Sequence, residues 1–331
     1  MRIRLLSALL VGLVFLPAAP RVAAQGVAAS SVLSAGVWRK VSVSESGVYH
    51  VSAATLRQMG FSDPSHVRVY GAGGAQLSHT VGADGRDDLK LLPAMHTSDG
   101  VIFYAQGPNG VVAQADGYYA PSLNAYSRKA YYYLTSAANV SDAIIRREAN
   151  DGAPVLTLSE YDNVCLYAPQ QVNVGQTGRE WVSSPVKSSR PSLSVPLSMT
   201  VSQGADVRVR YRLVAHLASQ GGCSIDIDGN NLADPSFSAA TALTTVFTVS
   251  QGAASFTAPS SSLSSLRVRA SLPGSSDCVW LSYVTVASRA PLSLPSGGSL
   301  AFRASEQAGG DGLVAFSIGG VDDATVVWDV T

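Results

Sequence analysis

The chain has 331 residues, of which 46% are hydrophobic and only 14% are charged. Its 23 basic and 23 acidic residues cancel, so it lacks the basic excess with which nucleic-acid binders neutralise phosphates. The apolar content is enough to bury one large core or two ordinary ones. We therefore expect a folded protein that does not bind nucleic acid and whose partners are not selected by net charge.

The start of the chain has the three parts of a secretory signal peptide. Arg2 and Arg4 precede an apolar run from Leu5 to Leu16, and small residues at Val22, Ala23 and Ala24 suit a cleavage site. The apolar run is about a dozen residues long, whereas a membrane-spanning helix needs roughly 20. We expect residues 1–24 to be removed and the remainder to be exported; the alternative is an uncleaved anchor.

Residues 25–155 have the pattern of a small α+β domain. Val37–Ser52 predicts a β-hairpin, because apolar and polar residues alternate on either side of a Glu-Ser-Gly turn. Ser52–Gly60 combines a capping serine, good helix formers and a terminal glycine, which predicts a short helix. Three further strands are predicted, at His66–Tyr70, Val101–Tyr104 and Tyr131–Leu134.

Residues 156–331 contain strand patterns alone. Between Val207 and Leu213, apolar residues alternate with three arginines, which predicts a strand with one buried and one solvated face. Val279–Ala287 is apolar on both faces, as a central strand would be. We expect a β-sandwich of jelly-roll or similar type, with a closed barrel as the alternative. Val326–Thr331 is strand-like and ends the chain without a covering segment, from which we infer that the sandwich is incomplete at its C-terminal end.

The sequence predicts no catalytic, metal-binding or cofactor-binding residue. It contains no G-x-S-x-G string, and no two of its histidines have the i, i+4 spacing of a zinc peptidase. Each histidine is interpreted as a surface or packing residue; they are His50, His66, His79, His96 and His216. A cysteine nucleophile would need one of them beside Cys165, Cys223 or Cys278 in the fold. Our interpretation is that no such pair acts catalytically.

One disulfide is reasonable in an exported chain. Cys223 and Cys278 both open strand-like runs, so they are the preferred pair, and Cys165 is left over. The alternative is three unpaired thiols.

Two motifs resemble ligand sites more weakly than they resemble turns. Gly71–Gly74 follows a strand but lacks the Lys-Ser/Thr and the third glycine of phosphate-binding loops, which favours a tight turn. Asp226, Asp228 and Asn230 have the spacing of an EF-hand loop, but Asn231 stands where that loop needs glycine. The same residues favour a type I′ hairpin turn.

Several strings occur in the order found in the N-terminal region of PorU-type sortases of the type IX secretion system, which the chain resembles over nearly all of its mature length. They are GVWRKVSVSESGVYHVSAATLRQMGF (Gly36–Phe61), HVRVYGAGG (His66–Gly74), VIFYAQGP (Val101–Pro108), VGQTGREW (Val174–Trp181), VWLSYVTVASRAPL (Val279–Leu292) and VWDVT (Val327–Thr331).

The resemblance implies a gingipain-type cysteine peptidase and transpeptidase at the surface of a Gram-negative bacterium. Such a sortase removes the C-terminal signal of secreted cargo and joins the cargo to lipopolysaccharide. The family's His-Cys pair lies in a domain that follows the VWDVT-like segment, so no position here matches it and no activity is expected from this chain alone. The resemblance implies as partners the peptidase domain, outer-membrane components of the secretion system and cargo proteins.

A different reading is a free-standing exported β-sandwich that binds a glycan or a partner protein. Its support is limited to aromatic residues that could lie at the surface, although such residues more often pack in a core or at a sheet edge; they are Trp38, Tyr118, Tyr119 and Trp181.

Overall fold

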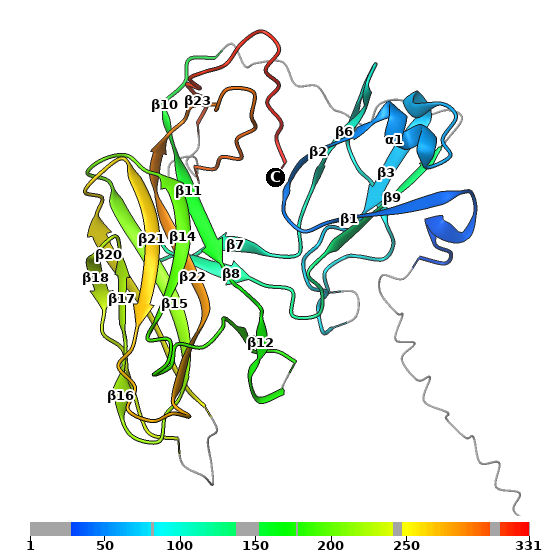
Figure 1. Cartoon of the computed structure of the whole chain (residues 1–331). Coiled ribbons are helices and arrows are strands. Elements are labelled where there is room, and N and C mark those ends of the chain that lie inside the picture. The colour runs from blue at the N-terminus through cyan, green and yellow to red at the C-terminus, as the bar shows by residue number, and fades with distance from the viewer. Residues whose placement is uncertain are drawn as a thin grey trace, which may run out of the picture.

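The computed structural model describes residues 28–80, 83–136, 152–176, 178–240, 247–304 and 312–330. The predicted signal peptide lies outside this range. Within the described residues, no helix is long and apolar enough to cross a membrane. The chain is mainly β, as expected, and Figure 1 shows a jelly-roll body beside a smaller body formed by the first strands.

The smaller body contains two antiparallel sheets and one short α-helix. The four-stranded sheet has the order β1-β9-β3-β4 and the three-stranded sheet the order β2-β6-β5. The strands are β1 (Trp38–Val43), β9 (Ala130–Ser136), β3 (Val67–Gly71), β4 (Lys90–Leu91), β2 (Gly47–Ser52), β6 (Gly100–Ala105) and β5 (Ala94–Thr97). The strands predicted around residues 66–70, 101–104 and 131–134 are therefore confirmed.

The helix α1 (Ala53–Gln58) confirms the prediction made from its capping pattern. The Ser52 side chain caps the N-terminus, since its Oγ accepts a hydrogen bond from the Thr55 backbone N–H at 3.2 Å. Leu56 is fully buried in the cluster formed by the two sheets. The apolar face of so short a helix is thus held by packing rather than by helix propensity.

The predicted hairpin over residues 37–52 is wrong in its pairing. Both strands exist, but β1 pairs with β9 and β2 pairs with β6, so the turn between them carries the chain from one sheet to the other. This turn packs against Gly107, where an added Cβ would lie 2.6 Å from the Glu45 carbonyl carbon. The Gly107 N–H also donates to the Ser46 Oγ at 2.9 Å. A tertiary contact therefore fixes the turn, and local sequence does not reveal it.

The larger body is a sandwich of two four-stranded antiparallel sheets. Their orders are β11-β22-β15-β20 and β14-β21-β17-β18. The first consists of β11 (Glu160–Tyr167), β22 (Cys278–Pro291), β15 (Asp206–His216) and β20 (Thr248–Thr257); the second of β14 (Ser192–Thr200), β21 (Ser262–Arg269), β17 (Ser224–Ile227) and β18 (Asn230–Ala233). Numbered one to eight along the chain, these strands have the orders 1-8-3-6 and 2-7-4-5, which is jelly-roll connectivity.

The inner faces of the two sheets form one hydrophobic cluster. On β15, Val207, Val209 and Leu213 are fully buried in it, as their alternation predicted. Strand β22 lies between β11 and β15 and is buried on both faces along most of its length, so the predicted central strand is confirmed.

Shorter elements complete the fold. Four two-stranded ladders join β7 (Gly110–Ala113) with β8 (Tyr119–Ser122), β10 (Leu156–Leu158) with β23 (Val314–Phe316), β12 (Val172–Asn173) with β13 (Trp181–Val182), and β16 (Gly221–Gly222) with β19 (Ser236–Phe237). Single turns of 3-10 helix occur at Val32–Ser34, Pro64–His66 and Val174–Gln176.

The strand-like reading of Val326–Thr331 is wrong for the described residues up to 330, which form no strand. Val326, Val327 and Val330 are exposed, because no sheet edge pairs with them. The division into domains at residues 155 and 156 stays a prediction, although each of the two large hydrophobic clusters draws on one side of it.

Candidate binding surfaces

The arginine face of β15 is covered rather than solvated, which corrects the sequence prediction. The β7–β8 hairpin, which extends from the smaller body in Figure 1, packs on the neighbouring strands β22 and β11, and its turn reaches these arginines. Arg208 Nη1 donates to the Gly117 carbonyl at 2.9 Å, and Arg210 Nη2 pairs with Asp116 Oδ2 at 2.5 Å. Beside them, the buried Thr285 Oγ1 donates to the Tyr119 carbonyl at 2.7 Å. Polar side chains of two neighbouring strands, β15 and β22, thus fix the position of a hairpin that is distant in sequence.

The third arginine of β15 holds the loop between β12 and β13. Arg212 donates to both oxygens of Glu180, at 3.2 and 3.1 Å, in a bidentate pair. Ser282 Oγ donates to the same carboxylate at 2.8 Å. The segment VGQTGREW therefore contributes its half-buried glutamate to contacts that hold this loop on the sheet.

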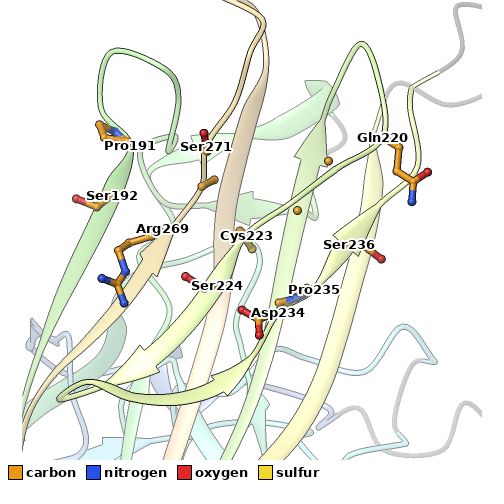
Figure 2. A pocket seen from close by; sticks show the side chains of 13 residues that line it. Pro191, Ser192, Gln220, Cys223, Ser224, Asp234, Pro235, Ser236, Arg269 and Ser271 are labelled. Carbon is orange, nitrogen blue, oxygen red and sulfur yellow. The ribbon is translucent and has the colours of Figure 1, made fainter.

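A groove of about 940 Å³ lies on the outer face of the second sheet. Ser192, Arg269 and Ser224 lie side by side across β14, β21 and β17, since they are register partners. Figure 2 shows Arg269 and Asp234 on either side of Ser224. The complete lining is Pro191, Ser192, Gln220, Gly221, Gly222, Cys223, Ser224, Asp234, Pro235, Ser236, Arg269, Ala270 and Ser271.

Both charged groups of the groove are oriented by neighbours. Arg269 Nη2 pairs at 2.7 Å with Asp226 Oδ2, whose side chain is only 2% exposed, while the arginine side chain is 53% exposed. Asn231 Nδ2 donates to Asp234 Oδ2 at 2.8 Å. The groove therefore presents a fixed cation, a fixed anion and several hydroxyl groups, which suits a polar ligand with hydrogen-bonding groups of both kinds.

The cysteines are free thiols, so the predicted Cys223–Cys278 disulfide is wrong. Cys223 points into the sandwich core beside the groove, and burial raises the pKa of its thiol to about 12, helped by the charge of Asp234. Burial also raises the pKa values of Cys165 and Cys278. A nucleophilic cysteine needs a lowered pKa, which favours the thiolate.

Cys278 and His216 are register partners on β22 and β15, an adjacency that the sequence did not reveal. The imidazole of His216 packs on Phe247, with ring centroids 5.9 Å apart. Burial is the main cause that raises the pKa of the Cys278 thiol, a shift opposite to the one that activates a nucleophilic cysteine.

The remaining histidines lie apart in the smaller body. His50 faces Asp99, His66 faces Asp63, His79 faces Gln76, and His96 lies beside Arg68 and the Val67 carbonyl. The packing and surface interpretation made from the sequence agrees with these contacts.

Asp226 and Asp228 belong to a hairpin turn, as interpreted from the sequence. Asp228 and Gly229 both have positive φ, 47° and 85°, which is the type I′ pattern between β17 and β18. Asp226 accepts the Gly229 N–H at 3.1 Å, and Asp228 accepts the Ser264 and Ser265 N–H groups at 2.8 and 2.9 Å. Over the residues that the structure describes, no group of three or more His, Cys, Asp or Glu side chains is placed to hold a metal ion.

The segment Gly71–Gly74 is packed against protein. An added Cβ at Gly74 would lie 2.4 Å from the Gly107 carbonyl, and Asn124 Nδ2 donates to the Gly74 carbonyl at 3.0 Å. A smaller hollow of about 380 Å³ beside it is lined by acids and bases together, which does not select for phosphate. These contacts favour the interpretation as a turn.

The aromatic residues expected at the surface serve packing instead. Trp38 meets Tyr70 edge-on at 5.2 Å between ring centroids, and Trp181 Nε1 donates to the Gly178 carbonyl at 3.1 Å. Tyr119 is buried, and Tyr118 lies under the Arg210 guanidinium. None of the four lines the groove.

Sequence reasoning missed the groove altogether. Ser192, Ser224, Asp234 and Arg269 are ordinary strand and turn residues, and only the pairing of three strands brings them together. The one local signal is the alternation Leu266-Arg267-Val268-Arg269, which is typical of a strand with its arginines on the solvent face.

No protein-family model matches the chain, and no curated protein matches it. Among solved structures, dimeric latent PorU from Porphyromonas gingivalis aligns with 88% of this chain at a TM-score of 0.75 and 24% sequence identity. The aligned part is 28% of the PorU chain, so the present sequence spans well under half of its length. A family 35 carbohydrate-binding module from Clostridium thermocellum aligns with 41% of this chain and 98% of its own at 13% identity; its TM-score of 0.23 carries no argument. The chain thus has the fold of a region of PorU.

Proposed function

We propose that this chain is the non-catalytic N-terminal part of a type IX secretion sortase, exported to the periplasm or surface of a Gram-negative bacterium and associated with the outer membrane. The observation that carries the proposal is the likeness to PorU over 88% of the chain. The ordered strings that resemble the N-terminal region of these sortases support it independently.

The role that suits such a part is to hold other proteins. The raised pKa values of the three thiols and the packing of the histidines argue against peptide chemistry by this chain alone. The partners that we propose are the peptidase domain, outer-membrane components of the secretion system and secreted cargo.

The test is deletion of the coding region for residues 28–330 in the bacterium that carries the gene, followed by immunoblots of a secreted cargo. We expect cargo to retain its C-terminal signal and to leave the cell surface. Normal cargo processing in the deletion strain would refute a role in the sortase. Peptide-bond cleavage by the purified chain, lost on substitution of one of its cysteines, would refute the non-catalytic assignment.

The groove favours a second candidate function, the binding of an uncharged glycan. Arg269 is already paired with Asp226, so the groove does not select an acid, but its guanidinium group, the Asp234 carboxylate and the serine hydroxyl groups can hydrogen-bond to a sugar. A glycan array with the wild type and Ser224→Trp tests this, because the indole projects into the groove between Arg269 and Asp234. Ser264→Trp, at an exposed position outside the groove, is the matched control. A ligand that all three proteins bind equally would refute the groove as the site.

A further inference from the structure

Strand β20 forms an open edge of the jelly roll. It pairs only with β15, over ten residues with no irregularity in the register. Its sequence, TVSQGAASFT, contains no charged residue and no proline. Figure 1 shows it at the side of the sandwich that faces away from the smaller body. Long, regular and uncharged edges of this kind accept further strands.

The other three edges of the sandwich carry features that oppose strand addition. Strand β14 contains Pro196 and a register shift next to it, where Ser198 has a φ of 47°. Strand β11 is covered at Asp162, whose N–H donates to the Arg303 carbonyl at 2.8 Å. Strand β18 has only four residues. Natural proteins protect their sheet edges with these devices, and β20 has none of them.

The direction of the backbone groups of β20 follows from one hydrogen bond. Ala258 N–H donates to the Ala205 carbonyl at 2.8 Å, so this pair is of the hydrogen-bonded kind. Because the two kinds of pair alternate along an antiparallel ladder, the even-numbered residues of β20 bond to β15. The odd-numbered ones turn their N–H and C=O groups to the open side; they are Val249, Gln251, Ala253, Ser255 and Thr257. Within the described residues, no backbone group outside β15 bonds to them.

The composition of the edge selects its occupant. A second copy paired through β20 would place Gly252, Ala253 and Ala254 opposite equally small residues. Such a contact, roughly 33 Å long, would bury roughly 700 Å² in total, below the roughly 1,200 Å² of stable dimers. An incoming strand with larger side chains covers more of this edge. Strand β20 carries no charge, and the arginines beside it on β15 are paired with acids, so uncharged side chains fit this edge best.

We propose that β20 binds an extended, uncharged segment of another protein by strand addition, with β-branched or aromatic side chains of that segment beside the small residues at its centre. The backbone hydrogen bonds supply the affinity, and the fit around Ala253 supplies the selectivity. This inference does not depend on the proposed sortase function, because it needs no peptidase domain.

The probe is a fluorescein-labelled ten-residue peptide in which threonine alternates with valine and phenylalanine. N-methyl groups on every second amide let it pair along one edge only. We expect saturable binding in fluorescence anisotropy and, in hydrogen–deuterium exchange, protection of the amides at Val249, Gln251, Ala253 and Ser255. The same peptide methylated at every amide is the control and should not bind.

Ala253→Pro is the decisive variant, because it removes an N–H that faces the open side while the ladder with β15 stays intact. We expect its binding to be weaker by at least about tenfold. Ala253→Ser, which keeps the N–H and adds only one oxygen atom, should bind like the wild type. Circular dichroism and the melting temperature of both variants show that they fold.

Several results would overturn the proposal. They are no binding at about 1 mM peptide, equal binding by Ala253→Pro, or protection confined to other strands. Concentration-dependent self-association in sedimentation that Ala253→Pro abolishes would also overturn it, because the occupant would then be a second copy.

Discussion

The contact between Thr285 and the β7–β8 hairpin gives the sharpest test of how the two bodies are joined. Thr285 is 1% exposed, and its hydroxyl donates to the Tyr119 carbonyl at 2.7 Å, where Tyr119 is itself only 6% exposed. Thr285→Val keeps the shape and removes the donor. Water cannot replace the lost hydrogen bond at so buried a carbonyl. The free energy of unfolding should therefore fall by about 1–2 kcal/mol, which combines the loss of the hydrogen bond with the penalty for an acceptor that is left incompletely satisfied.

Urea unfolding followed by tryptophan fluorescence measures this change in the free energy of unfolding. Limited proteolysis gives a local readout, because a loosened hairpin should be cut sooner between Gly110 and Ser122. Thr257→Val, at an exposed position of the same sheet, is the matched control and should change the free energy by less than about 0.5 kcal/mol. If the two variants unfold at the same urea concentration, the reasoning about the docked hairpin is refuted.

Three further outcomes follow from burial and backbone geometry. Leu266→Ala should lower the free energy of unfolding by about 2–5 kcal/mol, since this side chain is fully buried in the sandwich core, whereas the exposed neighbour Ser264→Ala should leave the urea midpoint nearly unchanged. Burial raises the pKa of the Cys223 thiol from 9.0 to about 12, so the contribution of the neutral thiol to stability is complete below pH 9 and is lost as the pH rises toward 12. Cys223→Ala should therefore make the free energy of unfolding fall less steeply between pH 9 and 11. Gly229→Ala should lower the free energy of unfolding by about 1–2 kcal/mol, because φ at this position is 85°. The control is Gly110→Ala, at an exposed strand position without that strain; equal melting temperatures of the two variants would contradict the prediction.

Local pattern determined the elements well. The alternation along residues 207–213, the apolar run at 279–287 and the capping serine before α1 are properties of neighbouring residues, and all three were placed correctly. The jelly-roll class followed from many strands without intervening helices. The turn at Asp228 and Gly229 was predictable for the same reason, because a left-handed backbone favours those two residue types.

Tertiary structure decided which strands pair and what covers each face. Sequence periodicity gave the arginines of β15 a solvent face, but two segments distant in sequence lie on it and use those charges. The hairpin at residues 37–52 failed because the side chains alternate in the same way whether a strand pairs with its neighbour in sequence or with a distant strand.

By itself, the sequence determined that this is a β-rich chain whose second part consists of strands, because side-chain alternation and turn chemistry act between adjacent residues. Only the tertiary structure decided where a ligand or partner can bind. The groove at Arg269 exists because strands from separate parts of the chain lie next to one another. The open edge of β20 exists because no further strand pairs with it in the described part of the chain. Hydrogen bonds between strands are formed by backbone N–H and C=O groups, which nearly all residue types share. The sequence therefore does not show which strands pair.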